Sequence, residues 1–280
     1  MNYRLLNISL NNYTNHFLTD LYVLSNGDKP YVYGCVPNGE LGISVIVSGQ
    51  GDINVDGPWV TQSPVAVYGL VSRVQFHRMS PGYREINIGF KPEFLQLFLR
   101  ERVSNLLRRN STDLMDLMNK DSVDELYASL QAAKSDNEIL SVVGRFLSRQ
   151  LISETIEKRV SYCLGTIRGG EIRNVESLSR HLNLSSATLR NLFRQHVGIS
   201  PKELFRIHRI KSALKTLHSC DESLTQAAYS LGYYDQSHFI HEFREAIGLT
   251  PKQYFQNKDL TFDFYNYQRW SLDSFGQNII

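Results

Sequence analysis

Two clusters of side chains near the C-terminal end of the chain carry groups that can pair with base edges in DNA. In the first, Arg190 can donate two hydrogen bonds to a guanine, and Asn191 can pair with an adenine. In the second, amide, hydroxyl and imidazole groups can reach polar base edges, while Ile240 can contact a thymine methyl group. The predicted base-contacting residues are Ala187, Arg190, Asn191, Gln236, Ser237, Ile240 and His241.

Four further basic side chains suit contacts to phosphate, which add affinity without reading the sequence. They are Arg194, Lys202, Arg244 and Lys252. A solvated face on an ordinary helix contains the same residue types, so this interpretation depends on the elements that carry them.

Those elements are encoded twice in the sequence. Residues 192–206 match residues 242–256 at an offset of 50 without a gap. The identical pairs are Phe193/Phe243, Arg194/Arg244, Gly198/Gly248, Pro201/Pro251, Lys202/Lys252 and Phe205/Phe255. In each copy the glycine can end a helix, and the Ser or Thr before the proline begins the next one with a capping box.

A pair of short helices is expected within each copy. The first pair is 175–182 and 185–197, with a turn at Asn183 and a cap at Ser185. The second begins with a capping box at Ser223, turns at Gly232, and continues from a cap at Asp235 to residue 246. The pattern of helix, tight turn and helix therefore occurs twice.

One continuous helix over residues 201–217 is predicted between the two units. About 17 residues make a rod of roughly 25 Å. Such a rod can hold two recognition helices about one DNA turn apart, with some bending of the DNA where the fit is short.

Composition favours a globular protein of two domains whose halves differ in charge. The chain has 280 residues, 42% hydrophobic and 21% charged, with a net charge of +2. Residues 157–256 hold 14 Lys and Arg against 9 Asp and Glu, whereas the remainder carries a net charge of −3. This asymmetry is typical of a protein with one part facing a polyanion.

The sequence contains no signal for a disulfide framework, a zinc site, a secretion leader or a membrane span. Cys35, Cys163 and Cys220 are far apart and form no C-x-x-C pair. The first residues contain Arg and Asn, and no apolar run approaches about 20 residues. We expect a cytoplasmic protein with no metal, no cofactor and no membrane partner.

The N-terminal half shows strand patterns followed by helical ones. Between residues 41 and 90, short apolar runs are broken by Gly, Asp, Asn and Pro, with a hairpin turn predicted at Asp56 and Gly57. Four to seven antiparallel strands follow, as in a small barrel or sandwich. Helical apolar stripes at 94–106 and 139–151 form either core or a dimer-forming face.

Residues 157–256 resemble the DNA-binding domain of the AraC/XylS family of bacterial transcription regulators. The strongest match is AAYSLGYYDQSHFIHEFREAIGLTPKQYF at 227–255, and the run RIKSA at 209–213 with Leu217 also fits. The first recognition helix departs from some relatives in its small Ala187 and Thr188, which leaves more of the reading to Arg190 and Asn191.

This resemblance implies an α+β protein in three parts. Residues 1–152 are expected to form a small cupin-like β-barrel with following helices, for sensing or dimerisation. Residues 153–256 are expected to form an all-α domain of two helix-turn-helix subdomains joined by a linker helix, and 257–280 form a tail. The implied partners are double-stranded promoter DNA, RNA polymerase for activation, a second copy in a homodimer, and a small-molecule effector in the barrel.

Several polar side chains of the strand region can line an effector site. They are Arg73, Gln75, His77, Arg84 and Asn87. Because alternate strand residues point to opposite faces, these side chains cannot all share one cavity.

The alternatives differ in chemistry. A metalloenzyme needs clustered ligands, and this half offers only His16 and His77 as imidazoles. A DNA-alkylation repair enzyme needs an activated cysteine, and Cys35 has no basic neighbours in sequence. We therefore expect no enzyme. The remaining alternative is an effector-independent regulator whose N-terminal half only dimerises or contacts other proteins.

Overall fold

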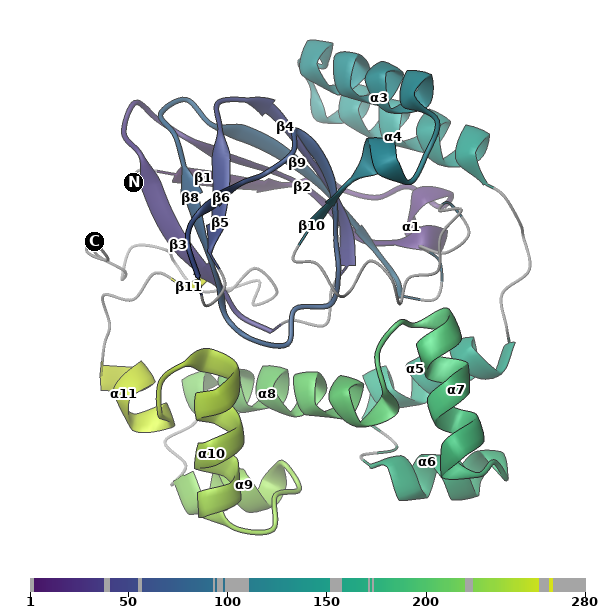
Figure 1. Ribbon diagram of the computed structural model, residues 1–280, viewed down its shortest axis with the longest axis vertical. Helices are drawn as coiled ribbons and strands as arrows, with labels where there is room; N and C mark the ends of the chain where they lie inside the picture. The colour runs from purple at the N-terminus through teal and green to yellow at the C-terminus, as the bar shows by residue number, and fades with distance from the viewer. Residues whose placement is uncertain are drawn as a thin grey trace.

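The computed structural model has a β-rich N-terminal part and an all-helical C-terminal part (Figure 1). The predicted α+β class is confirmed. The residues it describes are 3–37, 41–54, 57–92, 94, 98, 111–151, 158–170, 172, 174–219, 224–256 and 262–263. The predicted domain boundary at residues 152 and 153 falls outside these ranges. Among the helices within them, none is both long and apolar enough to cross a bilayer.

The described strands form two sheets. The order in the first is β1-β2-β9-β4-β7-β10, and in the second β11-β3-β8-β5-β6. The first contains β1 (Tyr3–Asn7), β2 (Leu18–Asn26), β4 (Leu41–Ser48), β7 (Val65–Tyr68), β9 (Arg84–Phe90) and β10 (Ser111–Asp113). The second contains β3 (Tyr31–Cys35), β5 (Gly51–Asn54), β6 (Val60–Thr61), β8 (Gln75–Met79) and β11 (Phe262–Asp263).

Neighbouring strands are antiparallel, except that β11 runs parallel to β3 and so brings two tail residues to the second sheet. The strands β4 to β9 match the predicted apolar runs between residues 41 and 90. The strands β1, β2, β3 and β10 lie outside that region and were not predicted. The predicted turn residue Asp56 lies outside the described residues.

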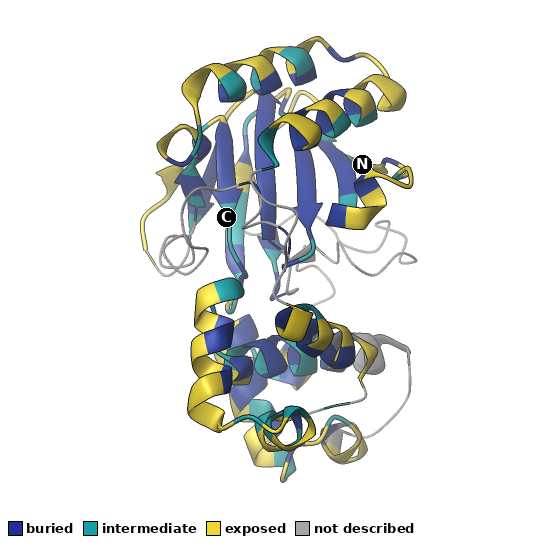
Figure 2. Cartoon of the chain, turned by 90° about the vertical axis from the view of Figure 1, so that its right-hand side faces the viewer, coloured by how far each residue is buried: buried dark blue, intermediate teal, exposed yellow. Residues whose placement is uncertain are grey.

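The first sheet has one apolar face, which packs beneath helices. Ile43, Val45, Ile86 and Ile88 alternate along β4 and β9 and are fully buried. They belong to one core with α1 (Thr14–Phe17), the 3₁₀ turn η2 (Leu114–Asp116), α3 (Lys120–Ala132) and α4 (Asp136–Gln150). In Figure 2 the helices α3 and α4 carry exposed residues on their outer sides, above a mostly buried sheet.

The apolar stripe of α4 serves the core. Ile139, Val143, Phe146 and Leu147 are all buried within the chain, which confirms the core interpretation for this stripe. Most of the other predicted stripe, 94–106, lies outside the described residues. Its Phe94 and Phe98 are buried in the same core.

The C-terminal part consists of helices, and the helix ends that were predicted, between residues 175 and 251, fall within one or two residues of the predicted positions. They are α5 (Lys158–Gly169), α6 (Val175–Leu182), α7 (Ser186–His196), α8 (Pro201–Ser219), α9 (Leu224–Ser230), α10 (Gln236–Ile247) and α11 (Pro251–Gln256). The capping residue predicted at Ser223 lies outside the described residues. The core of the N-terminal part continues without a break into the first pair of these helices, including Leu189 and Phe193 of α7.

Local hydrogen bonds explain where these helices begin and end. Asn183 ends α6 in the left-handed conformation, and the Ser185 hydroxyl accepts from the Thr188 backbone N–H at 3.1 Å to begin α7. Asp235 begins α10 by accepting from the His238 backbone N–H at 2.7 Å. Gly248, with φ at 80°, ends that helix.

The two predicted capping boxes that precede the prolines differ. The Thr250 hydroxyl accepts from the Gln253 backbone N–H at 3.2 Å, and the Gln253 side-chain oxygen accepts from the Thr250 backbone N–H at 3.0 Å. Ser200 accepts from the Glu203 backbone N–H at 3.2 Å, but the Glu203 carboxylate accepts from Arg206 instead. The predicted box at Ser200 is therefore half formed.

Candidate nucleic-acid interface

Helix α7 separates an apolar side from a polar side as the sequence predicted. Leu189, Leu192 and Phe193 are buried. The remaining side of α7 is exposed and includes four predicted DNA contacts: Ala187, Arg190, Asn191 and Arg194. The turn at Asn183 and the cap at Ser185 hold this exposed face at an angle to α6, which is the geometry of a helix-turn-helix unit.

Helix α10 repeats the arrangement in the second unit. Phe239, Phe243 and Ile247 are buried. The predicted contacts Ser237, His241 and Arg244 are exposed, whereas Gln236 and Ile240 are partly buried. The Thr225 hydroxyl of α9 donates to the Gln236 side-chain oxygen at 2.9 Å, which fixes this side chain at the start of α10.

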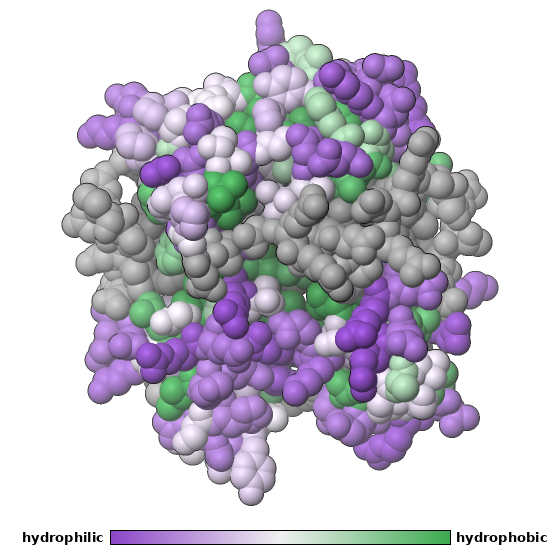
Figure 3. All heavy atoms as spheres, in the orientation of Figure 1, coloured by the Kyte–Doolittle hydropathy of each residue, from purple (hydrophilic) through white to green (hydrophobic). Residues whose placement is uncertain are grey.

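The four predicted phosphate contacts occupy equivalent places in the two units. Lys202 and Lys252 lie in the first turns of α8 and α11 and are exposed. A helix N-terminus favours negative charge, so a lysine there adds to an existing preference for phosphate. Arg194 and Arg244 lie in the last turns of α7 and α10. In the view of Figure 3 the helical part presents a mostly hydrophilic surface.

A single helix joins the two units. Helix α8 has 19 residues and is therefore roughly 28 Å long. Leu204, Ile207, Ala213 and Leu214 of its predicted apolar stripe are buried. The side chain of Leu217, also predicted there, lies outside the described residues.

An ion pair that the sequence analysis did not predict connects α8 to α10. The Arg209 guanidinium donates to both carboxylate oxygens of Glu242, with the shortest contact at 2.7 Å. The Tyr233 hydroxyl donates to Glu242 Oε1 at 2.7 Å, and the Arg209 guanidinium lies 5.3 Å from the centre of the Tyr233 ring. A signal was present, because Glu242 occupies a position on the buried side of α10 between Phe239 and Phe243.

Burial and charge act together in this network. Burial, followed by the charge of Glu242, raises the pKa of Tyr233 well above its usual value. Burial alone would lower the pKa of Arg209, but its hydrogen bonds to Glu242 and the carboxylate charge raise it instead. Both groups therefore keep their protons, and the linker helix and the second recognition helix are held together by three side chains.

An exposed aromatic residue near the second recognition helix was also not predicted from the sequence. Tyr234 lies in the turn between α9 and α10 with 86% of its surface exposed. A tyrosine hydroxyl can donate to phosphate, and this turn immediately precedes the recognition helix. Tyr234 is therefore a further candidate for contact with the phosphate backbone of DNA.

The proposed effector residues separate into different environments. Gln75 and His77 alternate on β8 and pair with Cys35 and Tyr33 of β3. Tyr33 and Met79 of these strands share an apolar cluster with Tyr22 and Ile46 of the first sheet, so this face looks toward the space between the sheets.

The other proposed effector residues lie elsewhere, with one exception. Arg73 is exposed and lies 3.8 Å from Glu245 of α10. Arg84 alternates with Ile86 on the side of β9 that faces the helices, near the strand's end. Asn87 lies opposite Tyr22 and Ser44, on the side facing the second sheet.

Polar groups continue along this inner face. The Ser44 and Tyr83 hydroxyls both donate to the buried Glu85 carboxylate. Burial raises the pKa of Glu85, against the opposing effect of these hydrogen bonds. The His77 ring stacks on Tyr33 with their centres 4.9 Å apart, and burial lowers the pKa of His77 to about 4. At neutral pH His77 is therefore an uncharged hydrogen-bonding group.

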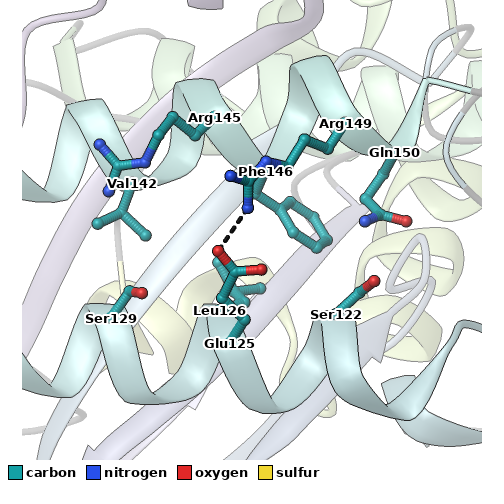
Figure 4. Close-up of a pocket in the computed structure, with 9 residues that line it drawn as sticks. All are labelled: Ser122, Glu125, Leu126, Ser129, Val142, Arg145, Phe146, Arg149 and Gln150. Atoms are coloured by element: carbon teal, nitrogen blue, oxygen red, sulfur yellow. Dashed lines mark hydrogen bonds and ion pairs between the residues drawn. The ribbon is translucent and has the colours of Figure 1, made fainter.

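Two of the hollows formed by the described residues lie between helices. The one between α3 and α4 has a volume of about 20 Å³, enough for little more than a water molecule, and the Arg149–Glu125 ion pair crosses it (Figure 4). The other measures about 220 Å³ and lies between α5, α8 and the end of α9, with Ile167, Phe205 and His208 among its lining residues.

Together, the two helix pairs, their exposed polar faces and the shared linker helix define a structural class, that of proteins with a double helix-turn-helix domain. Comparison with known proteins agrees with this class. A helix-turn-helix domain family matches residues 178–257.

Two curated relatives carry similar sequences. The transcriptional activator RhaS of Escherichia fergusonii is 25% identical over 151 residues, which cover 49% of this chain and 54% of RhaS. An uncharacterized helix-turn-helix transcriptional regulator of Haemophilus influenzae is 27% identical over 183 residues, which cover 62% of this chain and 55% of the regulator. The match thus spans about half the length of these relatives.

A solved structure of apo ToxT from Vibrio cholerae is also similar, at 14% identity and a TM-score of 0.43, covering 91% of this chain and 97% of ToxT. The match to a helix-turn-helix domain family over residues 178–257 agrees with the predicted resemblance for this part of the chain.

Proposed function

We propose that this chain is a sequence-specific transcription regulator that reads two successive major-groove segments of a promoter. The observation that carries the proposal is the repeated unit itself. Two helices, α7 and α10, each bury one side in their own unit and expose a polar side, and one rigid helix joins the units. In this proposal α7 reads the first segment and α10 the second, and the chain has no enzymatic activity.

The exposed side chains are proposed to make two kinds of contact, to bases and to phosphates. Arg190 and Asn191 of α7 read bases in one segment, and Gln236, Ser237 and His241 of α10 read the other. Ala187 and Ile240 make apolar contact. Arg194, Lys202, Arg244 and Lys252 contact phosphates and set the register of the protein on the duplex.

The N-terminal part is proposed to respond to a small polar effector. The supporting observation is the row of hydrogen-bonding groups on the facing sides of the two sheets, including His77, Gln75 and Asn87. Such groups suit an uncharged ligand rich in hydroxyl or amide groups. We do not retain Arg73 and Arg84 in this proposed site, because they point elsewhere.

The remaining parts of the proposal follow from the resemblance. Promoter binding in the cytoplasm, activation through RNA polymerase and assembly as a homodimer are properties that an AraC-type regulator is expected to have. The chain is proposed to share them.

Selection from a random duplex library tests the central claim. Purified full-length protein should enrich a bipartite sequence at moderate salt. Arg190→Ala should relax preference at one position of the first segment, at a cost of about 1–3 kcal/mol in binding free energy. Arg194→Ala should weaken binding to all duplexes alike, and Arg145→Ala, on the outer side of α4, should change nothing. Absence of any enriched sequence would refute the proposal.

Thermal unfolding tests the effector. A ligand that binds the native state raises the melting temperature by mass action. Screening the full chain against small polar metabolites should identify compounds that raise it, and substitution of Asn87 by Leu should abolish the shift. Absence of any shift across the screen would favour the effector-independent alternative.

A further inference from the structure

The core of the second helix-turn-helix unit contains a side chain from the N-terminal half of the chain. Among its described buried residues, all but one lie between Ile210 and Tyr254. The exception is Val36, which directly follows β3 and is only 3% exposed. Val74 is partly buried against the same cluster. Two N-terminal valines therefore complete the apolar core behind α10.

The segment just before β8 also caps the end of α10. The Val74 backbone N–H donates to the Ala246 carbonyl at 2.7 Å. Carbonyls in the last turn of a helix have no partner within that helix, so this bond satisfies one of them from outside. A Cβ atom at Gly248 would lie 3.9 Å from the Val74 side chain, so the strand segment stays in contact beyond the helix end.

Charged groups continue the contact towards the linker helix. Arg73 lies 3.8 Å from Glu245 of α10, and Glu245 lies 3.3 Å from Arg206 of α8. Arg73 and Glu245 are about half exposed, so this pair orients the contact more than it strengthens it. The burial of Val36 and the backbone bond of Val74 are the principal contacts.

We propose that Val36 and Val74 are positioning residues for the second recognition helix, so that the N-terminal domain sets how selectively the second DNA segment is read. This inference rests on the proposed function. Helix α10 is a rigid element of 12 residues, so a displacement at Ala246 is transmitted to Gln236 and Ser237 at its other end. Hydrogen bonds to base edges weaken steeply with poor alignment, whereas phosphate contacts by long side chains adapt.

The test compares full-length variants by selection from a random 30-base-pair duplex library. Val36→Thr combined with Val74→Thr keeps side-chain size but places hydroxyl groups in the apolar core. Val60→Thr is the matched control, because Val60 belongs to the same domain but is 63% exposed. Val36→Ile is the conservative variant. A separate Gln236→Ala variant identifies the segment read by α10, which is where its sequence preference disappears.

The double threonine variant should lose about tenfold in base preference within the α10 segment and keep its preference in the α7 segment. Val60→Thr and Val36→Ile should keep both. Equal loss in the two segments, or loss in neither, would overturn the proposal.

Hydrogen exchange of backbone amides provides a second measurement that needs no DNA. Amides in the last turn of α10 should exchange at least tenfold faster in the double variant, while those around Phe193 of α7 should not change. If the wild-type chain selects no sequence, the proposed function fails, and unchanged exchange in α10 would separately overturn the positioning role. If the double variant does not fold, Val36→Ala takes its place with the same expected results.

Discussion

At the scale of single residues, Arg209 and Glu242 show how a charge can occupy the inner side of a recognition helix. The carboxylate has three hydrogen-bond donors in two side chains around it, and only 11% of the side chain is exposed. A buried pair of this kind gains little over an apolar pair, but removing one partner leaves the other charge desolvated. The pair therefore fixes the angle between α8 and α10 more than it adds stability.

Substituting Glu242 by Gln should lower the free energy of unfolding by about 3 kcal/mol, because the Arg209 charge is left partly buried without its partner. Urea denaturation of the full chain measures this. Glu125→Gln is the matched control, since its ion pair with Arg149 is more than half exposed on both sides. Its expected cost is at most about 1 kcal/mol. Similar costs for the two substitutions would contradict the role given to the buried pair.

His77 should make stability depend on pH in a defined window. Its pKa is about 4 in the folded chain and 6.5 when exposed, so only the unfolded state gains a proton as the pH falls between these values. Stability contributed by neutral His77 is complete above pH 6.5 and is lost as the pH approaches 4. His77→Phe retains ring stacking on Tyr33 and removes the titration.

Relative to this variant, the wild-type chain should lose about 2 kcal/mol between pH 6.5 and 4, after allowance for partial exposure of the ring. Urea denaturation at a series of pH values measures the difference. Glu85, whose raised pKa acts in the opposite direction, is present in both proteins and cancels. A difference that does not vary with pH would show that His77 is exposed to water.

At the scale of elements, helix ends were predictable because their signals are local. Asn183, Ser185, Asp235 and Gly248 each act through backbone groups within five residues of themselves. The strand runs between residues 41 and 90 were predictable for the same reason. Strands β1 and β2 were not, because Arg4, Thr19 and Asp20 interrupt their apolar pattern, and pairing with distant segments supplies the stability.

The site residues also divide into those predictable from local sequence and those that depend on contacts between distant segments. Exposure of Arg190, Asn191 and His241 followed from helical spacing, which sequence reveals. The Glu242 network and the insertion of Val36 join residues far apart in the chain, and no spacing rule predicts them. Strand alternation correctly warned that the proposed effector residues lie on different faces, but tertiary structure was needed to place Arg73 beside Glu245.

The cap of α10 can be tested on its own. Asp235→Ala should lower the free energy of unfolding by about 1 kcal/mol, because the His238 backbone N–H loses its acceptor. Asp235→Asn retains a side-chain oxygen and should cost little. Thermal unfolding of the three proteins in parallel measures both. An alanine variant as stable as wild type would mean that water replaces the cap without cost.

At the scale of the whole molecule, α8 sets a fixed distance between the two reading surfaces. A helix of roughly 28 Å is shorter than one turn of DNA, about 34 Å, and it cannot lengthen. The N-terminal part packs against both units, which restricts them further. The protein should therefore tolerate only one spacing between its two DNA segments.

Inserting either 5 or 10 base pairs between the segments of a selected site should reduce affinity at least tenfold, because only one unit can then bind. Electrophoretic mobility shifts with the full chain measure this. Two units joined by a flexible tether would behave differently. An insertion of 10 base pairs, one turn of DNA, returns both segments to the same face of the duplex, and a flexible tether could then reach both. Recovery of affinity at 10 base pairs, but not at 5, would contradict a rigid linker.

The insertion of Val36 into the core behind α10 limits how this protein can be recombined with others. A chimera that joins residues 158–256 to a foreign sensor loses that side chain and uncovers part of the apolar cluster that Val36 shares with the second unit. Unless the new sensor domain places an aliphatic side chain at the same position, the second helix-turn-helix unit of the chimera lacks part of its apolar core. The two halves of the chain are therefore fitted to each other and are not freely exchangeable parts.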